Sequence, residues 1–124
     1  MKKEKPSAYL YLVGEQDTRY IKIGITSQGL MTRLRNIQTG NPRRLEFISC
    51  FLFQNREQAE DIESRVLGKH QNKTPHLTVG EWFYLPEDIS FTEFFQRVLN
   101  MARDKRYKVV KTVHNPIFIN YEAM

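Results

Sequence analysis

Two features that the sequence lacks limit what kind of protein it is. Cys50 is the only cysteine among 124 residues, which excludes an internal disulfide and a thiolate cluster for zinc. No apolar run approaches the roughly 20 residues of a transmembrane helix, and the basic start MKKEKPS is not followed by the apolar region of a signal peptide. We therefore expect a cytoplasmic protein without a membrane partner, in which Cys50 is a small core residue.

Positive charge is in excess, and the hydrophobic content is sufficient for a core. Lys and Arg number 19 against 14 Asp and Glu, which gives a net charge of +5 and favours anionic partners. Hydrophobic residues make up 40% of the chain, enough for one compact domain of this length. We expect this domain at residues 8–105, with a basic arm at residues 1–7 and a strand or arm of unknown role at residues 106–124.

Hydrophobic periodicity predicts a mixture of strands and helices. Alternation in Ala8–Val13 and Tyr20–Thr26 indicates an antiparallel hairpin, and the apolar run Leu45–Phe53 indicates a strand covered on both faces. We further expect an extended segment at residues 80–85 and helices at residues 28–38, at 56–71 and after Ser90, whose spacing to Glu93 forms a capping box. Together these elements predict an α/β fold with a small, largely antiparallel three-stranded sheet flanked by helices.

The hairpin collects polar and aromatic residues on the face that its aliphatic residues leave free. Pairing Tyr11 with Lys22 would place the leucines and isoleucines of both strands on one buried side. The other side then carries Tyr9, Tyr11, Tyr20, Lys22 and Gly24. An ammonium group beside a phenol favours the phenolate, which is a usable base. The alternative is an ordinary cross-strand aromatic pair with a solvated lysine.

Two charged residues lie close to apolar helix faces. Arg33 is next to the stripe formed by Leu30, Leu34 and Ile37, which predicts a half-buried guanidinium group. Glu63 falls in the middle of the apolar face of the second helix. A buried carboxylate must be paired, protonated or bound to a cation, because an isolated charge costs several kcal/mol there. Helical spacing leaves two alternatives open, a structural ion pair between Arg33 and Glu63 and a metal site.

The order of these residues resembles the GIY-YIG nuclease superfamily. The segment YLY, which ends at Tyr11, is similar to the first motif, and KIG, Lys22 to Gly24, is similar to the second. Arg33 and Glu63 follow at matching positions, and the likeness covers about Ala8 to Leu85. KIG together with a segment such as GEWF resembles the branch found in phages and bacteria, which implies a bacterial cell or a phage-infected host.

The resemblance implies a role for each matching residue. Tyr11 would act as general base on the attacking water or orient it, and Lys22 would keep Tyr11 deprotonated or contact the phosphate. Arg33 would neutralise charge that develops on the phosphate in the transition state. Glu63 would bind one divalent cation, Mg²⁺ or Mn²⁺, which assists the leaving 3′ oxygen.

We therefore expect a metal-dependent endonuclease that hydrolyses DNA. Further DNA contacts are expected at Tyr9, Tyr20, Arg43 and Arg44. Trp82 and Phe83 are interpreted as packing beside the site, with base stacking as the alternative. The alternative function is a nucleic-acid-binding or assembly module that keeps the fold without turnover, although a pure binder has no need of a carboxylate that repels phosphate. The oligomeric state is left open, with a homodimer among the options.

Overall fold

A five-stranded antiparallel sheet forms the middle of the molecule. The computed structural model describes residues 7–27, 29–39, 44–73 and 82–114. The strands are β1 (Ala8–Glu15), β2 (Tyr20–Thr26), β3 (Leu45–Phe53), β4 (Trp82–Tyr84) and β5 (Val109–His114), arranged in the order β4-β2-β1-β3-β5. The helices in this part of the chain are α1 (Leu30–Thr39), α2 (Arg56–Lys73) and α3 (Phe91–Asp104). The α/β class and the antiparallel pairing agree with the sequence, but the expectation of three strands was wrong.

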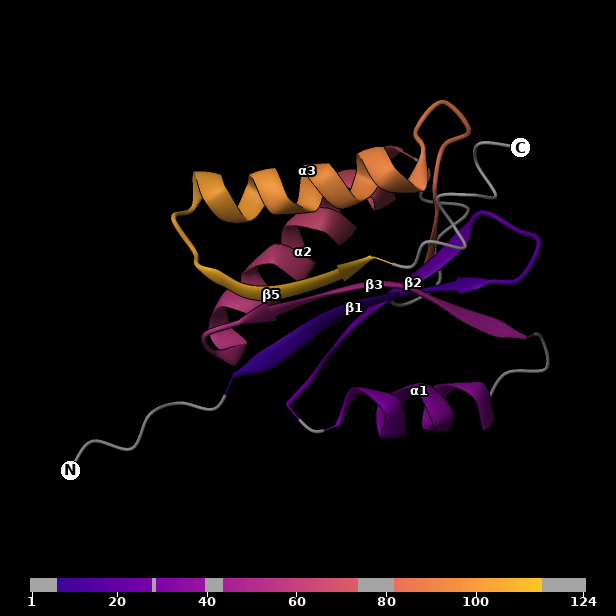
Figure 1. Cartoon of the computed structure of the whole chain (residues 1–124). Helices are drawn as coiled ribbons and strands as arrows, with labels where there is room; N and C mark the ends of the chain where they lie inside the picture. Colours follow the sequence, from indigo (N-terminus) through magenta and orange to yellow (C-terminus); the bar gives the residue numbers. More distant parts are fainter. Residues whose placement is uncertain (1–6, 28, 40–43, 74–81, 115–124) are drawn as a thin grey trace.

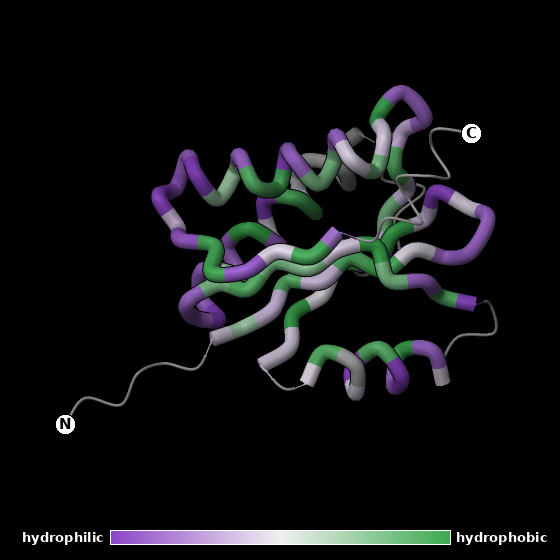
Figure 2. The backbone as a smooth tube through the Cα atoms, viewed as in Figure 1, coloured by the Kyte–Doolittle hydropathy of each residue, from purple (hydrophilic) through white to green (hydrophobic). Residues whose placement is uncertain are grey.

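The helices cover both faces of the sheet. Figure 1 shows α2 and α3 on one face and α1 on the other. The larger core lies under α2 and α3, and in Figure 2 the hydrophobic residues of these helices turn toward the strands. A smaller cluster lies on the α1 side, where Tyr11, Val13 and Cys50 are buried against residues of α1, β1 and β3. Burial raises the pKa of the Cys50 thiol, which fits its expected place in the core.

The strand β3 is apolar on both faces because it contributes to both clusters. Phe51 and Phe53 belong to the larger core, whereas Phe47 and Cys50 face α1. A register shift beside Leu12 and Val13 inserts an extra residue in β3, which changes the face that its side chains point to. The prediction that this strand is covered on two sides is confirmed.

The hairpin between β1 and β2 has a different register from the expected one. Tyr11 pairs with Gly24, and Lys22 pairs with Val13. The reason is that β1 continues through Gly14 to Glu15, because these residues also pair with β3. The chain then reverses within residues 16–19, where the Thr18 amide donates to the Glu15 carbonyl over 3.1 Å. The two-residue shift keeps every side chain on its expected face but moves Lys22 away from the position opposite Tyr11.

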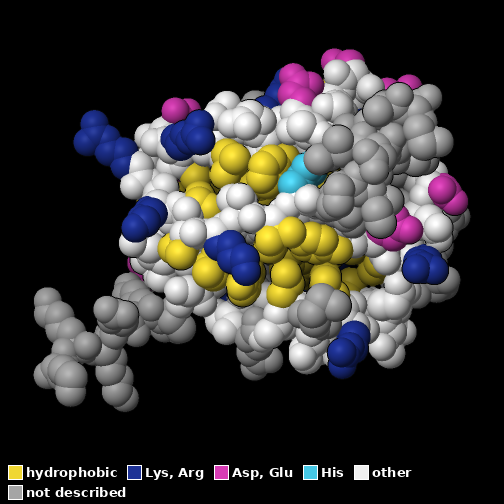
Figure 3. All heavy atoms as spheres, in the orientation of Figure 1, with side chains coloured by type: hydrophobic (Ala, Val, Ile, Leu, Met, Phe, Trp, Pro, Cys, Tyr) yellow, Lys and Arg dark blue, Asp and Glu magenta, His cyan; other side chains and the backbone are white. Residues whose placement is uncertain are grey.

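The two additional strands lie at the edges of the sheet. β4 pairs with Tyr20–Lys22 of β2, and β5 pairs with β3. The extended segment expected at residues 80–85 is a strand over Trp82–Tyr84, and the strand or arm expected at residues 106–124 is a strand over Val109–His114. On β5, Val110 and Val113 are 52% and 40% exposed, and Figure 3 shows hydrophobic surface along this edge, with Lys and Arg dispersed around it. This face therefore has no continuous basic stripe in the part that the structure describes.

The connection from β4 to α3 is held by the hairpin. The Arg19 guanidinium group donates to the carbonyl oxygens of Leu85, Pro86 and Ile89 and lies over the Phe91 ring, 5.0 Å from its centroid. One of the two hydrogen bonds of the predicted capping box is confirmed: the Glu93 amide donates to Ser90 Oγ over 2.9 Å. None of the helices described is long and apolar enough to cross a membrane.

A tyrosine–carboxylate hydrogen bond joins α2 to the segment before β5. Tyr107 Oη donates to Asp61 Oδ2 over 2.6 Å, and Arg65 Nε lies 3.1 Å from Asp61 Oδ1. The Tyr107 hydrogen bond lowers the pKa of Asp61 below its ordinary value of 3.8. The same bond raises the pKa of Tyr107 above its ordinary value of 10.0.

We expect Tyr107→Phe to lower the melting temperature near neutral pH and to do so less at both extremes of pH. The Asp61 contribution is present above pH 3.8 and is lost as the pH falls through the lowered native pKa. The Tyr107 contribution is present below pH 10.0 and is lost as the pH rises through the raised native pKa. Phe keeps the ring that packs edge-on against Phe53. Thermal melting across pH measures the difference, and a constant difference down to strong acid would contradict the assignment.

Candidate functional site

The phenol of Tyr11 lies across the backbone of Gly24. Tyr11 is fully buried, and its ring passes over the neighbouring strand toward the edge of the sheet. A Cβ atom built on Gly24 would overlap the hydroxyl oxygen and Cζ of Tyr11. A glycine is therefore required at this point of β2 because the phenol occupies the space of a side chain.

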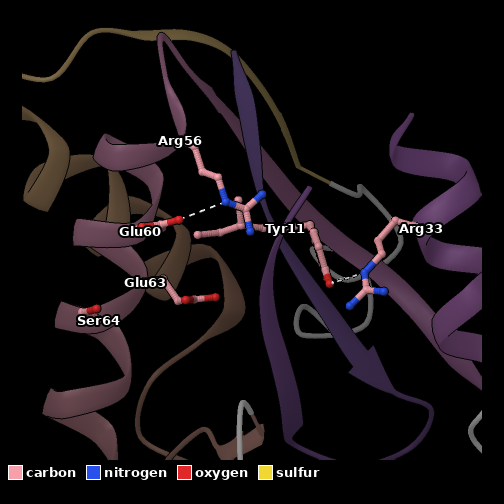
Figure 4. Close-up of a pocket in the computed structure, with 7 residues that line it drawn as sticks. Tyr11, Arg33, Arg56, Glu60, Glu63 and Ser64 are labelled. Carbon is pink, nitrogen blue, oxygen red and sulfur yellow. Dashed lines mark hydrogen bonds and ion pairs between the residues drawn. The ribbon is translucent and has the colours of Figure 1, made fainter. Parts of the chain in front are cut away.

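A pocket of about 330 Å³ opens at the edge that the phenol reaches. β4 pairs only with Tyr20–Lys22, so that among the residues described no strand pairs with the outer edge of the second half of β2. The helices on the two faces of the sheet both contribute side chains here, as Figure 4 shows. The residues that line the pocket are Tyr11, Ile25, Arg33, Arg56, Glu60, Glu63 and Ser64.

Tyr11 and Arg33 are in direct contact within this pocket. Arg33 Nε donates to Tyr11 Oη over 3.1 Å, and the guanidinium group is partly buried as its helical position predicts. A guanidinium group has only donors, so Tyr11 Oη is the acceptor and the phenol O–H points elsewhere. The remaining N–H groups of Arg33 are left for another acceptor in the pocket. Tyr11 and Arg33 thus present one hydroxyl and one fixed positive charge to the same space.

Glu63 faces Tyr11 and Arg33 from α2, on the opposite side of the pocket (Figure 4). Its side chain is partly exposed rather than enclosed in the core. The structure therefore brings Tyr11, Arg33 and Glu63, which the resemblance had placed in one site, together from β1, α1 and α2.

The pocket contains two further charged residues, Arg56 and Glu60, that were not expected from the sequence. Arg56 Nε lies 2.9 Å from Glu60 Oε1, and Arg56 Nη1 lies 3.4 Å from Ser27 Oγ. Ser64 lines the pocket one position after Glu63. The signal was present, because residues 56, 60 and 63 share one helix face at spacings of four and three. Following the face of Glu63 back along α2 would have found both Arg56 and Glu60.

The carboxylates could hold a hard divalent cation. Glu63 supplies oxygen ligands in a pocket that also contains Glu60, although Glu60 is paired with Arg56. In the part of the chain that the structure describes, His, Cys, Asp and Glu form no group of three or more with metal-binding geometry. One or two carboxylates completed by water and a substrate phosphate is the usual arrangement for Mg²⁺ in phosphoryl-transfer sites. The donor set therefore fits Mg²⁺ or Mn²⁺ better than zinc.

Lys22 and Tyr20 lie beside the pocket rather than in it. Lys22 Nζ is 5.8 Å from the centroid of the Trp82 ring, and Tyr20 packs edge-on against Tyr84 with the ring centroids 5.2 Å apart. The expectation that Lys22 stands opposite Tyr11 was wrong, since the register places Val13 opposite Lys22.

The remaining residues expected to contact DNA are spread out. Tyr9 is partly buried against the cluster on the α1 side, and it pairs with Thr26 of β2. Arg44 is exposed, and its carbonyl oxygen accepts from the Gln16 amide over 2.8 Å. Arg43 and the arm at residues 1–6 lie outside the described residues.

We expect Gly24→Ala to destabilise the fold and displace the Tyr11 phenol. Overpacking of this kind costs about 1 to 3 kcal/mol, because the added methyl group and the phenol cannot occupy the same space. Gly68→Ala is the matched control, since nothing lies within 4 Å of the new methyl group. In the helix interior that change should stabilise by about 0.5 to 1 kcal/mol. Chemical denaturation measures both, and equal effects of the two substitutions would contradict the close contact.

Comparison with known proteins gives a family but no individual relatives. The T5orf172 domain model matches residues 8–113, which include all five strands apart from the last residue of β5 and all of the pocket. A search of curated proteins and a search of solved structures returned no match. The chain belongs to the T5orf172 domain family.

Proposed function

We propose that this protein is a metal-dependent endonuclease that hydrolyses phosphodiester bonds in DNA. The observation that carries the proposal is the meeting of Tyr11, Arg33 and Glu63 in one pocket, with Arg33 Nε 3.1 Å from Tyr11 Oη. A hydroxyl, a guanidinium group and a carboxylate are the groups needed to position a water, neutralise a phosphate and hold a cation. The net charge of +5 favours a polyanionic substrate.

The family supports the same reading. T5orf172 domains are associated with nuclease-related domains. We infer in addition that this chain is a GIY-YIG-type enzyme, because YLY, KIG, the arginine and the glutamate of that pattern belong to elements that meet at one pocket. The two chain segments that carry the first and second motifs, β1 and β2, are adjacent in the sheet, and Gly24 of the second motif directly underlies Tyr11 of the first.

Each side chain then has a defined task. Tyr11 directs its hydroxyl toward the attacking water, which it orients as a phenol or deprotonates as a phenolate. Arg33 fixes the phenol through Nε and uses its other N–H groups on a phosphate oxygen. Attack by the water forms the new P–O bond while the bond from phosphorus to the leaving 3′ oxygen breaks. The proton of the water passes to the Tyr11 phenolate or to solvent, and the 3′ oxygen takes up a proton from solvent. Lys22, two residues before Gly24 on the same face of β2, takes the phosphate-binding role that the sequence left open.

Glu63 is the residue that would hold the cation, with Glu60 as its neighbour on the same helix face. When bound there, Mg²⁺ or Mn²⁺ would polarise a phosphate oxygen and assist departure of the 3′ oxygen. Glu60 holds Arg56 through the 2.9 Å ion pair and so aims a second guanidinium group into the pocket. Two arginines on opposite sides can bind different oxygens of one phosphate. This would hold the phosphate so that the attacking water, the phosphorus atom and the leaving oxygen lie in one line.

We expect Glu63→Gln to abolish metal-dependent nicking of supercoiled plasmid while duplex affinity stays equal or rises. The substitution keeps the shape of the side chain and removes the charge that holds the cation and repels phosphate. Glu57→Gln is the matched control, because Glu57 is an exposed acid on the same helix that does not line the pocket. Plasmid nicking with and without Mg²⁺, affinity in EDTA and thermal melting are measured for both variants.

The outcomes separate the alternatives. If a folded Glu63→Gln protein nicks plasmid at the rate of the unsubstituted protein, Glu63 has a structural role and does not bind the catalytic metal. Loss of the folded state in this variant alone would support a structural ion pair instead. Tight, salt-sensitive DNA binding by the parental protein without cutting under any metal would assign the chain to the binding-module alternative.

Two arginines of α2 form similar ion pairs but differ in their distance from the pocket. Arg56 and Arg65 each pair with an acid four positions away on α2 and are 51% and 47% exposed. Only Arg56 lines the pocket. We expect Arg56→Met to lower the rate of DNA cleavage by roughly tenfold or more, because one phosphate contact is lost. Arg65→Met should leave cleavage nearly unchanged. Single-turnover kinetics at saturating DNA measures both, and equal rates would remove Arg56 from the site.

A further inference from the structure

Four aromatic and cationic side chains share one face of β2 and β4, which we call the aromatic face: Tyr20, Lys22, Trp82 and Tyr84. They form two directly opposed cross-strand pairs, Tyr20 with Tyr84 and Lys22 with Trp82. The two tyrosine rings meet edge-on at 5.2 Å between centroids, and the Lys22 ammonium lies 5.8 Å from the Trp82 ring centroid. This arrangement is ordered by the sheet rather than by a loop.

The aromatic face is not part of either core. Phe83, between Trp82 and Tyr84, is fully buried in the larger core, so its two neighbours point to the opposite side. On that side the buried cluster is made by residues of α1, β1 and β3 and contains no member of β2 or β4. All four side chains of the aromatic face are partly exposed. Phe83 packs in the core as expected, but the partly exposed Trp82 does not, so core packing does not explain a tryptophan at this position.

The aromatic face leads directly to the pocket. Lys22 and Gly24 occupy successive positions on one face of β2, which are about 6.5 to 7 Å apart. Gly24 underlies the Tyr11 phenol, so the cationic end of the aromatic face borders the proposed catalytic site. The far end carries an acid, because Tyr84 Oη donates to Glu87 Oε1 over 3.2 Å. A strand with its phosphates near Lys22 and its bases toward the rings would match this polarity.

We infer that the aromatic face binds unpaired bases of DNA next to the phosphate that is cut. The inference rests on the proposed function and narrows its substrate to DNA with a single-stranded segment, such as an overhang or a flap. Aromatic rings bind single strands by stacking on exposed base faces, which a closed duplex hides between neighbouring base pairs. A purely electrostatic DNA contact would require lysines and arginines but not three rings beside a single lysine.

Trp82 makes a direct test possible because it is the only tryptophan in the chain. The full-length protein is titrated in EDTA with oligothymidine and with a blunt duplex of equal length, at one salt concentration. Stacking of a base on the indole should quench the fluorescence of Trp82 with oligothymidine, and the affinity for the single strand should exceed that for the duplex by roughly tenfold. Equal affinities without quenching would overturn the inference. Self-association that shifts the Trp82 emission without DNA would assign the aromatic face to a second copy of the chain and would also overturn it.

Paired substitutions separate loss of a ring from loss of folding. Trp82→Phe and Tyr84→Phe keep a stacking ring, whereas Trp82→Leu and Tyr84→Leu remove it. The binding of labelled oligothymidine, followed by anisotropy, should stay within about twofold in the Phe variants and weaken by roughly tenfold in the Leu variants. Thermal melting checks the fold, and duplex affinity should be the same in all four. Equal single-strand binding by the folded Phe and Leu variants would overturn the inference.

The same measurements distinguish failure of this inference from failure of the proposed function. Quenching and ring-dependent binding, without cleavage of plasmid or of a duplex with a single-stranded overhang in Mg²⁺ or Mn²⁺, would support base binding by the aromatic face and contradict the nuclease activity. Cleavage of duplex plasmid with no quenching of Trp82 fluorescence, and with no effect of ring removal on binding, would support the nuclease activity and contradict base binding by the aromatic face.

Discussion

The contact between the Tyr11 phenol and the backbone of Gly24 links the core of this protein to its surface. Because Gly24 has no side chain, a tyrosine from the central strand can cross β2 and deliver its hydroxyl to the edge of the sheet. The ring is fully buried and packed on the α1 side, so the position of the hydroxyl is set by the core itself. Arg33 then completes the arrangement with one hydrogen bond of 3.1 Å.

The pocket combines charges of both signs in a way that suits work on phosphate. Arg33 of α1 and Arg56 of α2 reach into the pocket from opposite sides, and the carboxylates of Glu60 and Glu63 lie on the α2 side (Figure 4). A phosphate and a cation would thus find complementary groups within one small volume. Among the residues that the structure describes, β4 pairs only with Tyr20–Lys22, so that no described strand covers the edge of β2 at the pocket. The same short strand places Trp82 and Tyr84 beside Lys22 and Tyr20.

Most helices and the long strands were predictable from local pattern. The stripe on α1 and the doubly apolar β3 indicate which faces are buried, and the capping box marks the start of α3. β4 and β5 lie within the extended segment expected at residues 80–85 and the strand or arm expected at residues 106–124. Neither was counted in the sheet, since one has three residues and the other alternates weakly at an exposed edge. The convergence of Tyr11, Arg33 and Glu63 was expected from the resemblance of their order to a known nuclease family, whereas Arg56 and Glu60 were not expected in the site.

The sequence by itself determined which face each side chain of the hairpin takes, because alternation survives a shift of two residues. It could not determine which residue stands opposite Tyr11, since pairing with Lys22 and pairing with Gly24 bury the same aliphatic residues. Only the tertiary structure decided this, through the pairing of Gly14 and Glu15 with β3, which extends β1 and shortens the turn. Lys22 thereby became the neighbour of Trp82, a contact between two segments far apart in the chain that no local pattern encodes.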